Sequence, residues 1–197
     1  MKLLFIRHGE TDVNASGVLH KAHDPEGLNE KGRKQASALA EVCMREGVEV
    51  VYTSPEKRAV ETAEIIGGIL GLQPLTIEDF RERNFGDWSG RSWPEMKEEL
   101  YKMSTEERYT FRPPGGESWK DVEERLRKAV TRVVGGESGV VAVVSHAGVT
   151  RALMPILKNE PKDTSYKYIF GNGSITSFEY KDGKYTELAV NDTSHLS

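Results

Sequence analysis

Three short segments of the chain are almost uninterrupted in apolar residues: Leu3–Ile6, Val48–Tyr52 and Val140–Val144. A strand with one face in water alternates apolar and polar side chains, whereas a strand that is covered on both faces reads as a continuous apolar run. Strands of the second kind are typical of parallel sheets. The pattern therefore predicts three buried strands of a mostly parallel sheet.

Between these strands, apolar residues recur with the period of a helix. The predicted helices are Leu28–Glu46, Pro55–Leu70, a segment from about Ser118 to Val134 and one that follows Gly148 through Leu157. In the first, Ala36, Leu39, Ala40 and Cys43 share one face, as expected of an amphipathic helix that packs on a sheet. The order of strands and helices predicts an α/β fold, a three-layer, doubly wound, mostly parallel sheet with helices on both faces.

Two further segments complete the predicted fold. Near the C-terminus, SITSFEY and KYTELAV alternate and are joined through Asp182-Gly183, which predicts a hairpin at the edge of the sheet. From Arg91 to Gly116, aromatic residues are spread through short charged segments. We expect a short helical insertion there, a lid over one end of the sheet, although two ordinary surface helices fit the pattern equally well. A length of 197 residues predicts one domain that covers 1–197.

The composition argues against several classes of protein. With 37% hydrophobic and 29% charged residues, the chain is too apolar for disorder and too polar for a membrane protein. A net charge of −4 argues against a nucleic-acid surface. The apolar run LLFI is too short for a signal peptide, so we expect a cytoplasmic protein without membrane attachment. The single cysteine, Cys43, is expected to be a buried apolar residue rather than a nucleophile.

Polar residues follow directly where two of the predicted strands end. Arg7 and His8 come after the first strand, and His146 comes after the third, just before the helix that follows Gly148. The carboxyl ends of parallel strands lie at one edge of the sheet, and ligands of open α/β sheets bind there. Arg7, His8 and His146 are therefore predicted to lie close together, beside the free N–H groups of a helix N-terminus.

The second strand is predicted to bring a further cation to the same edge. It is followed by Ser54 and Pro55, which we expect to be the N-cap and the first residue of the next helix. Arg58 then lies near the first helical turn. Because helical side chains lean toward the helix N-terminus, its guanidinium can reach the same edge.

Two arginines, two imidazoles and a helix N-terminus match a phosphoryl group in charge and geometry, and Asn14 adds a neutral donor. Taken singly, each of these residues is more typical of a surface arginine or of a histidine with its hydrogen bonds satisfied. Cations at the end of a buried strand, however, cost desolvation energy unless an anion compensates them. Their coincidence at three strand ends therefore indicates a bound anion.

These residues lie in segments that resemble the histidine phosphatase superfamily, which includes the cofactor-dependent phosphoglycerate mutases and many small phosphatases. The matching segments, in family order, are RHGETDVN at 7–14, LNEKGRKQA at 28–36, TSPEKRAVETA at 53–63, FRERNFGDWSG at 80–90, PGGES at 114–118 and SHAGVTRAL at 145–153. The resemblance covers nearly the whole chain. RHGE followed by SHAG is a specific combination, whereas PGGES alone is weak.

The resemblance implies a role for six residues. His8 would become phosphohistidine, and Glu82 would protonate the leaving oxygen. The phosphoryl oxygens would be bound by Arg7, Asn14, Arg58 and His146. General chemistry agrees with the two chemical roles, because a neutral imidazole can attack phosphorus and later release it to water. A carboxylic acid can neutralise an alkoxide leaving group, and its carboxylate can then activate water.

Three functions are compatible with this pattern. The first is a metal-independent phosphomonoesterase that hydrolyses a small phosphorylated metabolite through phosphohistidine, without a cofactor. The second is a phosphoglycerate mutase, although the mutases that the chain resembles are generally longer, with larger insertions around the site. The third is a noncatalytic phosphate-binding module, which would need neither His8 nor Glu82. The phosphatase is therefore the expected function, and the sequence defines neither its substrate nor its oligomeric state.

The chain departs from the usual family pattern after Asn14. Where many members have a Gln-Gly pair, it has His20-Lys21, and the loop that follows is one residue longer. In the family this loop borders the substrate, so the departure concerns specificity. His20, His23 and Asp24 are also possible metal ligands. Such spacing is common by chance and no cysteine or further histidine lies nearby, so we expect no metal site.

Overall fold

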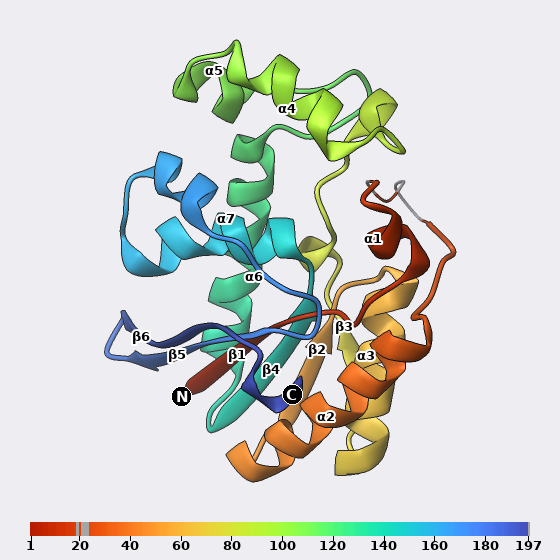
Figure 1. Cartoon of the computed structure of the whole chain (residues 1–197). Coiled ribbons are helices and arrows are strands. Elements are labelled where there is room, and N and C mark those ends of the chain that lie inside the picture. Colours follow the sequence, from red (N-terminus) through yellow and green to blue (C-terminus); the bar gives the residue numbers. More distant parts are fainter. Residues whose placement is uncertain (19, 21–23, 197) are drawn as a thin grey trace.

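The computed structural model describes residues 1–18, 20 and 24–196, and within them six strands form one sheet in the order β3-β2-β4-β1-β5-β6 (Figure 1). The strands are β1 (Lys2–Arg7), β2 (Val50–Thr53), β3 (Leu75–Thr76), β4 (Val140–Ser145), β5 (Ile175–Lys181) and β6 (Lys184–Asp192). The first four in this spatial order are parallel, and β5 runs antiparallel to β1. The predicted, mostly parallel sheet is confirmed.

Helices cover both faces of the sheet. α2 (Glu30–Glu46) and α3 (Lys57–Leu70) pack on one face, where Leu4 and Ile6 of β1 point. α6 (Trp119–Gly136) and α7 (Ala147–Lys158) pack on the other, against Leu3 and Phe5. All four β1 side chains are buried, and each contributes about 1.5 to 3 kcal/mol through loss of apolar surface from water. The continuous apolar run is thus explained by the three-layer arrangement, which confirms the predicted fold class.

The predicted hairpin forms the edge of the sheet (Figure 1). β5 and β6 are joined by Asp182 and Gly183, whose φ angles are +51° and +77°. Two successive left-handed residues are the requirement of a two-residue turn that matches the twist of antiparallel strands. Asp and Gly tolerate that conformation better than most residues. The hairpin could therefore be located from two residues of sequence.

The start of α3 differs from the prediction. The helix begins at Lys57, Glu56 is its N-cap residue, and no side chain caps it. Ser54 lies two residues before this N-cap residue, and its hydroxyl lies 2.7 Å from Nε2 of His146 and 3.5 Å from the backbone nitrogen of Glu56. Pro55 therefore precedes the helix rather than opening it. Arg58 still falls in the first turn, so the correction leaves its predicted position intact.

The segment between Arg91 and Gly116 is helical, as predicted, and forms α4 (Trp93–Tyr101) and α5 (Thr105–Thr110). Both lie at the top of Figure 1, apart from the helices that cover the sheet. Ser92, just before α4, pairs with Val18, a residue that lines the candidate site described below. The insertion thus borders the site; its movement as a lid stays a prediction. None of the described helices is long and apolar enough to cross a membrane.

Candidate active site

His8 lies at the carboxyl end of β1, and its backbone N–H donates to the carbonyl of Ser145 at the end of β4 (2.9 Å). The imidazole is buried. Its Nδ1 is 2.7 Å from the carbonyl oxygen of Gly9, which only a protonated Nδ1 can satisfy. Nε2 is therefore the unprotonated nitrogen, and Nε of Arg58 donates to it (3.3 Å). This tautomer presents the Nε2 lone pair as a nucleophile.

The surroundings of His8 keep its ring neutral. Burial lowers the pKa of His8 well below its usual value, and the positive charges of Arg58 and Arg7, together with His146, lower it further. A protonated imidazole has no lone pair at Nε2 and cannot attack phosphorus. The same arginines that suit a bound anion therefore also favour the neutral form of His8.

His146 is fixed by a network that the sequence did not reveal. Its Nδ1 is 3.2 Å from Nη2 of Arg58, and its Nε2 is 2.9 Å from Oε2 of Glu56. The ring centroids of His8 and His146 are 5.1 Å apart. Burial raises the pKa of Glu56, but the hydrogen bond from His146 and nearby Arg58 outweigh it and bring the pKa to about 2. Glu56 is thus a carboxylate that orients His146, which in turn supports Arg58.

Arg58 is buried and Arg7 is half-buried, and neither has a carboxylate ion-pair partner among the described residues. Arg7 donates from Nη1 to the carbonyl of Phe170 (2.6 Å). Within the described part of the chain, Nε of Arg7 and Nη1 of Arg58 are buried and have no hydrogen-bond partner. Burial lowers the pKa of Arg7 to about 10, so the guanidinium stays charged at neutral pH. Unpaired buried cations are costly, and an anion bound between them removes that cost.

Asn14, in α1 (Asp12–Ser16), is oriented so that its amide nitrogen is available as a donor. Its Oδ1 accepts from the backbone N–H of Thr11 (3.3 Å) and from Nδ2 of Asn172 (2.9 Å). Asn172 also reaches the carbonyl of His8 (3.3 Å). Asn172 therefore joins the C-terminal part of the chain to both residues, although nothing in its surrounding sequence signalled this role.

Glu82 is held at the N-terminus of α7. Its Oε2 accepts from the backbone N–H of Gly148 (3.2 Å) and its Oε1 from that of Arg83 (2.8 Å). A Cβ atom at position 148 would lie 2.3 Å from Oε1, so the carboxyl group occupies space that only glycine leaves open. Behind it, the buried Arg125 of α6 donates to the backbone carbonyl of Glu82 (3.2 Å). Two backbone N–H groups thus hold the carboxyl group, and Arg125 holds the backbone of the same residue.

A cavity of about 330 Å³ brings the predicted residues together. Five of the six line it: Arg7, His8, Asn14, Arg58 and Glu82. His146 is not among the lining residues, but its Nδ1 contacts Arg58, which is. The arrangement offers an unprotonated imidazole nitrogen, two guanidinium groups and a carboxyl group to one ligand. These are the groups that transfer of a phosphoryl group to nitrogen requires.

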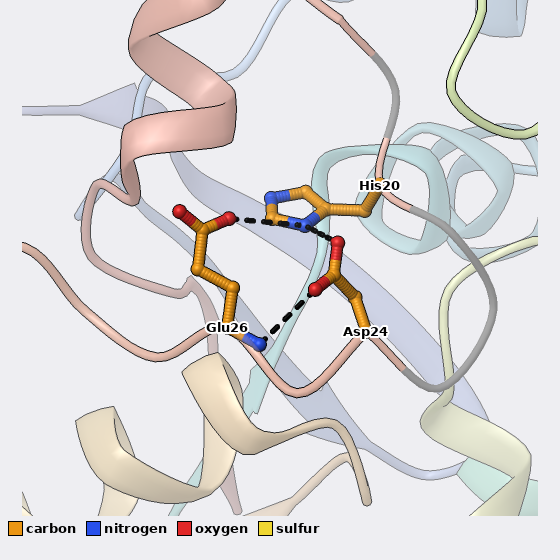
Figure 2. Close-up of side chains that lie close together, drawn as sticks. All are labelled: His20, Asp24 and Glu26. Carbon is orange, nitrogen blue, oxygen red and sulfur yellow. Dashed lines mark hydrogen bonds and ion pairs between the residues drawn. The ribbon is translucent and has the colours of Figure 1, made fainter.

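His20 also lines this cavity and is held by acidic residues of the departing loop (Figure 2). Its Nδ1 is 3.2 Å from Oδ2 of Asp24 and 3.9 Å from Oε2 of Glu26. Its Nε2 lies 3.0 Å from the hydroxyl of Thr11 and 3.3 Å from Nδ2 of Asn14. Burial and Arg58 lower the pKa of His20 to about 4, against the opposing effect of Asp24. A neutral His20 therefore accepts one N–H of Asn14 and positions that amide.

The same cluster contains two of the three metal ligands considered from the sequence. His20, Asp24 and Glu26 each offer a ligand atom, and these atoms lie within 4.8 Å of one another, while His23 and Lys21 lie outside the described residues. Oδ1 of Asp24 accepts from the backbone N–H of Glu26 (3.1 Å). These contacts form a hydrogen-bonded unit that supports Asn14; the expectation of no metal stays a prediction.

The comparisons with known proteins agree with this geometry. The model of the histidine phosphatase superfamily (branch 1) matches residues 3–193. The chain belongs to the histidine phosphatase superfamily. The family prediction made from the motifs is therefore confirmed.

Relatives of this superfamily member come from plants and bacteria. It is 36% identical to phosphoglycerate mutase-like protein 4 of Arabidopsis thaliana, over 99% of this chain and 86% of that protein. It is 32% identical to a metal-independent phosphoserine phosphatase of the same plant, over 100% of this chain and 83% of the relative. In contrast, it spans about half the length (55%) of mycobacterial relatives that are 33% identical to it.

Solved structures share the fold. The structure of a mycobacterial glucosyl-3-phosphoglycerate phosphatase in complex with VO3 superimposes with a TM-score of 0.86 and 30% identity. The match covers 98% of this chain and 99% of that one. This histidine phosphatase-superfamily chain thus has the architecture of proteins that are named phosphatases. The chemical roles of its own site residues stay predictions.

Proposed function

We propose that the chain is a metal-independent phosphomonoesterase that hydrolyses a small phosphorylated metabolite through phosphohistidine at His8. One observation carries the proposal. A neutral, buried imidazole accepts from Arg58 at its Nε2, and it shares one cavity with Arg7 and Glu82; neither arginine has a carboxylate ion-pair partner among the described residues. The names of the relatives support hydrolysis of phosphorylated metabolites.

In the first step, Nε2 of His8 attacks phosphorus, so that an N–P bond forms while the P–O bond to the alcohol breaks. Negative charge on the phosphoryl oxygens is stabilised by Arg7, Arg58 and the Nδ2 group of Asn14. The Glu82 carboxylic acid donates its proton to the departing oxygen. The alcohol leaves as a neutral molecule, and the phosphoryl group stays on His8.

In the second step, the Glu82 carboxylate accepts a proton from water as the water oxygen attacks phosphorus. The new O–P bond forms, the N–P bond breaks, and Glu82 is again protonated. Inorganic phosphate leaves the arginines, and His8 regains its neutral ring. His146, held by Glu56, keeps Arg58 in place through both steps. No step requires a metal ion, because guanidinium groups supply the positive charge.

Quenched turnover of a ³²P-labelled phosphomonoester tests this mechanism. Acid-labile, alkali-stable label should appear on wild-type protein and be absent from His8→Ala, whereas label on a serine or on Cys43 would contradict the assignment.

Incubation with 3-phosphoglycerate and a trace of 2,3-bisphosphoglycerate separates the three alternative functions. Release of inorganic phosphate supports the hydrolase, rapid formation of 2-phosphoglycerate indicates a mutase, and binding without turnover of any phosphomonoester indicates a noncatalytic module. The cytoplasmic location stays a prediction.

A further inference from the structure

The carboxylate of Glu56, just before α3, contacts two segments of the candidate site at once. Its Oε2 lies 2.9 Å from Nε2 of His146, and its Oε1 accepts from the backbone N–H of Glu82 (3.1 Å). Because only 11% of the Glu56 side chain is exposed, its oxygens depend on these protein donors more than on water. One largely buried carboxylate thus joins the predicted phosphate-binding residue His146 to the predicted acid Glu82.

The contact with Glu56 is linked to the tautomer of His146. Burial and Arg58 lower the pKa of His146, against the opposing effect of Glu56, so the ring is neutral and carries one proton. A guanidinium nitrogen can only donate, so Nδ1 of His146, 3.2 Å from Nη2 of Arg58, must be the acceptor. The proton is therefore on Nε2, which donates a hydrogen bond to the Glu56 carboxylate.

Arg58 extends this chain of hydrogen bonds to the nucleophile. Its Nη2 donates to His146, and its Nε donates to Nε2 of His8 (3.3 Å). The hydrogen bond at one nitrogen of a histidine determines what the other nitrogen can do. By accepting at Nε2, Glu56 keeps the lone pair of Nδ1 available for Arg58. Glu56 therefore holds, through His146, the guanidinium that contacts His8.

Glu56 also belongs to a closed set of contacts around the start of α7. His146 is the N-cap residue of this helix, and the backbone N–H of Gly148, in its first turn, donates to Oε2 of Glu82 (3.2 Å). The backbone N–H of Glu82 in turn donates to Glu56. The two hydrogen bonds of the Glu56 carboxylate thus fix the backbone of Glu82 relative to His146.

We propose that Glu56 is a positioning residue for the reaction, whose two carboxylate oxygens hold the phosphate-binding half of the site and the acid in one arrangement. This role rests on the proposed phosphatase function. It requires two acceptor oxygens, and an amide has only one. With the substitution Glu56→Gln, the side chain can accept from His146 or from Glu82, and its NH2 group then faces the other N–H.

Removal of the whole side chain tests both contacts together. In Glu56→Ala, kcat/KM for alkyl phosphates should fall by about a hundred-fold, the cost of a misplacement of about 1 Å. Hydrolysis of p-nitrophenyl phosphate should fall by only about ten-fold, because it depends on Arg58 but needs no proton from Glu82. Equal losses for the two substrates would contradict the role of Glu56 in placing the acid.

The substitution Glu56→Gln tests the requirement for two oxygens and keeps the length of the side chain. It should slow alkyl phosphates by about ten-fold, since either orientation of the amide breaks one contact and both contacts serve this reaction. Wild-type kcat/KM in Glu56→Gln would overturn the proposal, and this variant alone decides it if Glu56→Ala does not fold.

Rescue by a small carboxylate separates positioning from folding. Glu56 and the exposed Glu78 line a cavity of about 260 Å³, through which formate can reach the space left by Glu56→Ala. Formate has two acceptor oxygens and should raise kcat/KM of this variant by about ten-fold or more, whereas formamide, which has one, should raise it less. Glu78→Ala is the matched control, and neither compound should activate it or the wild type. Absence of rescue by formate, or equal rescue by both compounds, would refute the positioning role.

Binding of inorganic phosphate keeps this result separate from the fate of the proposed function. Calorimetric titration should show about ten-fold weaker binding to Glu56→Ala than to wild type, because Arg58 is no longer held. Formate, at a concentration that leaves phosphate binding to wild type unchanged, should restore the affinity. Equal affinities of the two proteins refute positioning through His146 even if the enzyme is an active phosphatase. Weaker binding that formate restores supports it even if the chain hydrolyses no phosphomonoester.

Discussion

The substitution Gly148→Ala isolates the role of Glu82. The added Cβ would lie 2.3 Å from Oε1 of Glu82, whereas ordinary contacts begin near 3.4 Å, so the carboxyl group must move by about 1 Å. A misplacement of that size costs roughly a hundred-fold in a catalytic step. We therefore expect kcat/KM for alkyl phosphates, whose alkoxides need a proton, to fall by about ten- to a hundred-fold. Hydrolysis of p-nitrophenyl phosphate should change little, because its phenolate leaves without a proton.

Stability provides the control for this experiment. Position 148 has a helical backbone, in which alanine is favoured over glycine by about 0.5 to 1 kcal/mol, so the variant should unfold at a similar urea concentration. Gly68→Ala is the matched substitution, because Gly68 lies in α3 and its added Cβ would meet nothing within 4 Å. Gly68→Ala should keep full activity toward both substrates.

Combination with Glu82→Gln gives the decisive result. If Gly148→Ala acts only by displacing the carboxyl group, it should add almost nothing to the loss already caused by Glu82→Gln, since the two changes then act on one interaction. Equal slowing of alkyl phosphates and p-nitrophenyl phosphate by Gly148→Ala, or independent and additive losses in the double variant, would refute the assignment of Glu82 as the leaving-group acid.

Three further predictions follow from the same site. Arg58→Ala should lower kcat/KM by about ten- to a hundred-fold or more, because the phosphoryl oxygens lose a charge-assisted hydrogen bond. A chelator should leave wild-type activity intact, and strict dependence on a divalent ion would contradict the mechanism. Asn172→Ala should raise KM because the side chain of Asn14 loses the hydrogen bond from Asn172 that orients it. An unchanged KM would show that Asn14 does not depend on this hydrogen bond. The pKa of His20 in the folded protein is about 4, below the ordinary value of about 6.5. The unfolded chain therefore binds the proton more tightly than the folded protein does. As a result, the free energy of unfolding decreases as the pH falls from about 6.5 to about 4. Urea titrations should show His20→Gln losing less stability than wild type over that window, and parallel losses would rule out the effect.

The sequence predicted the parts of this site that depend on local order. Arg7 and His8 follow an apolar run that had to be a strand, and the end of such a strand has a known position in an α/β sheet. The contacts that orient these residues could not be predicted in the same way. Glu56 reaches His146, 90 positions away, and Asn172 reaches Asn14, 158 positions away. Such contacts depend on how the layers pack, and a single glutamate or asparagine in a polar stretch carries no periodic signal.

The error at Ser54 has the same origin. The motif Ser-Pro is typical of a helix start. This local preference predicts the N-cap correctly only where no distant group forms a hydrogen bond with the serine hydroxyl. Here the end of β4 brings His146 to within 2.7 Å of the Ser54 hydroxyl, and α3 begins only at Lys57 without a side-chain cap.

The position of β1 at the centre of the sheet has a consequence for synthesis on the ribosome. β1 is flanked by β4 and β5, so its first residue pairs with Val140 and Glu179. At a translation rate of about 5 to 20 residues per second, the apolar β1 segment waits roughly 7 to 28 s for its first neighbour, β4, to be made. During that interval the edges and faces of β1 that are buried in the folded sheet are exposed and can pair with other chains. Nascent chains stopped before residue 140 should therefore be protease-sensitive at β1 and bound by chaperones, with protection gained only once β4 has emerged.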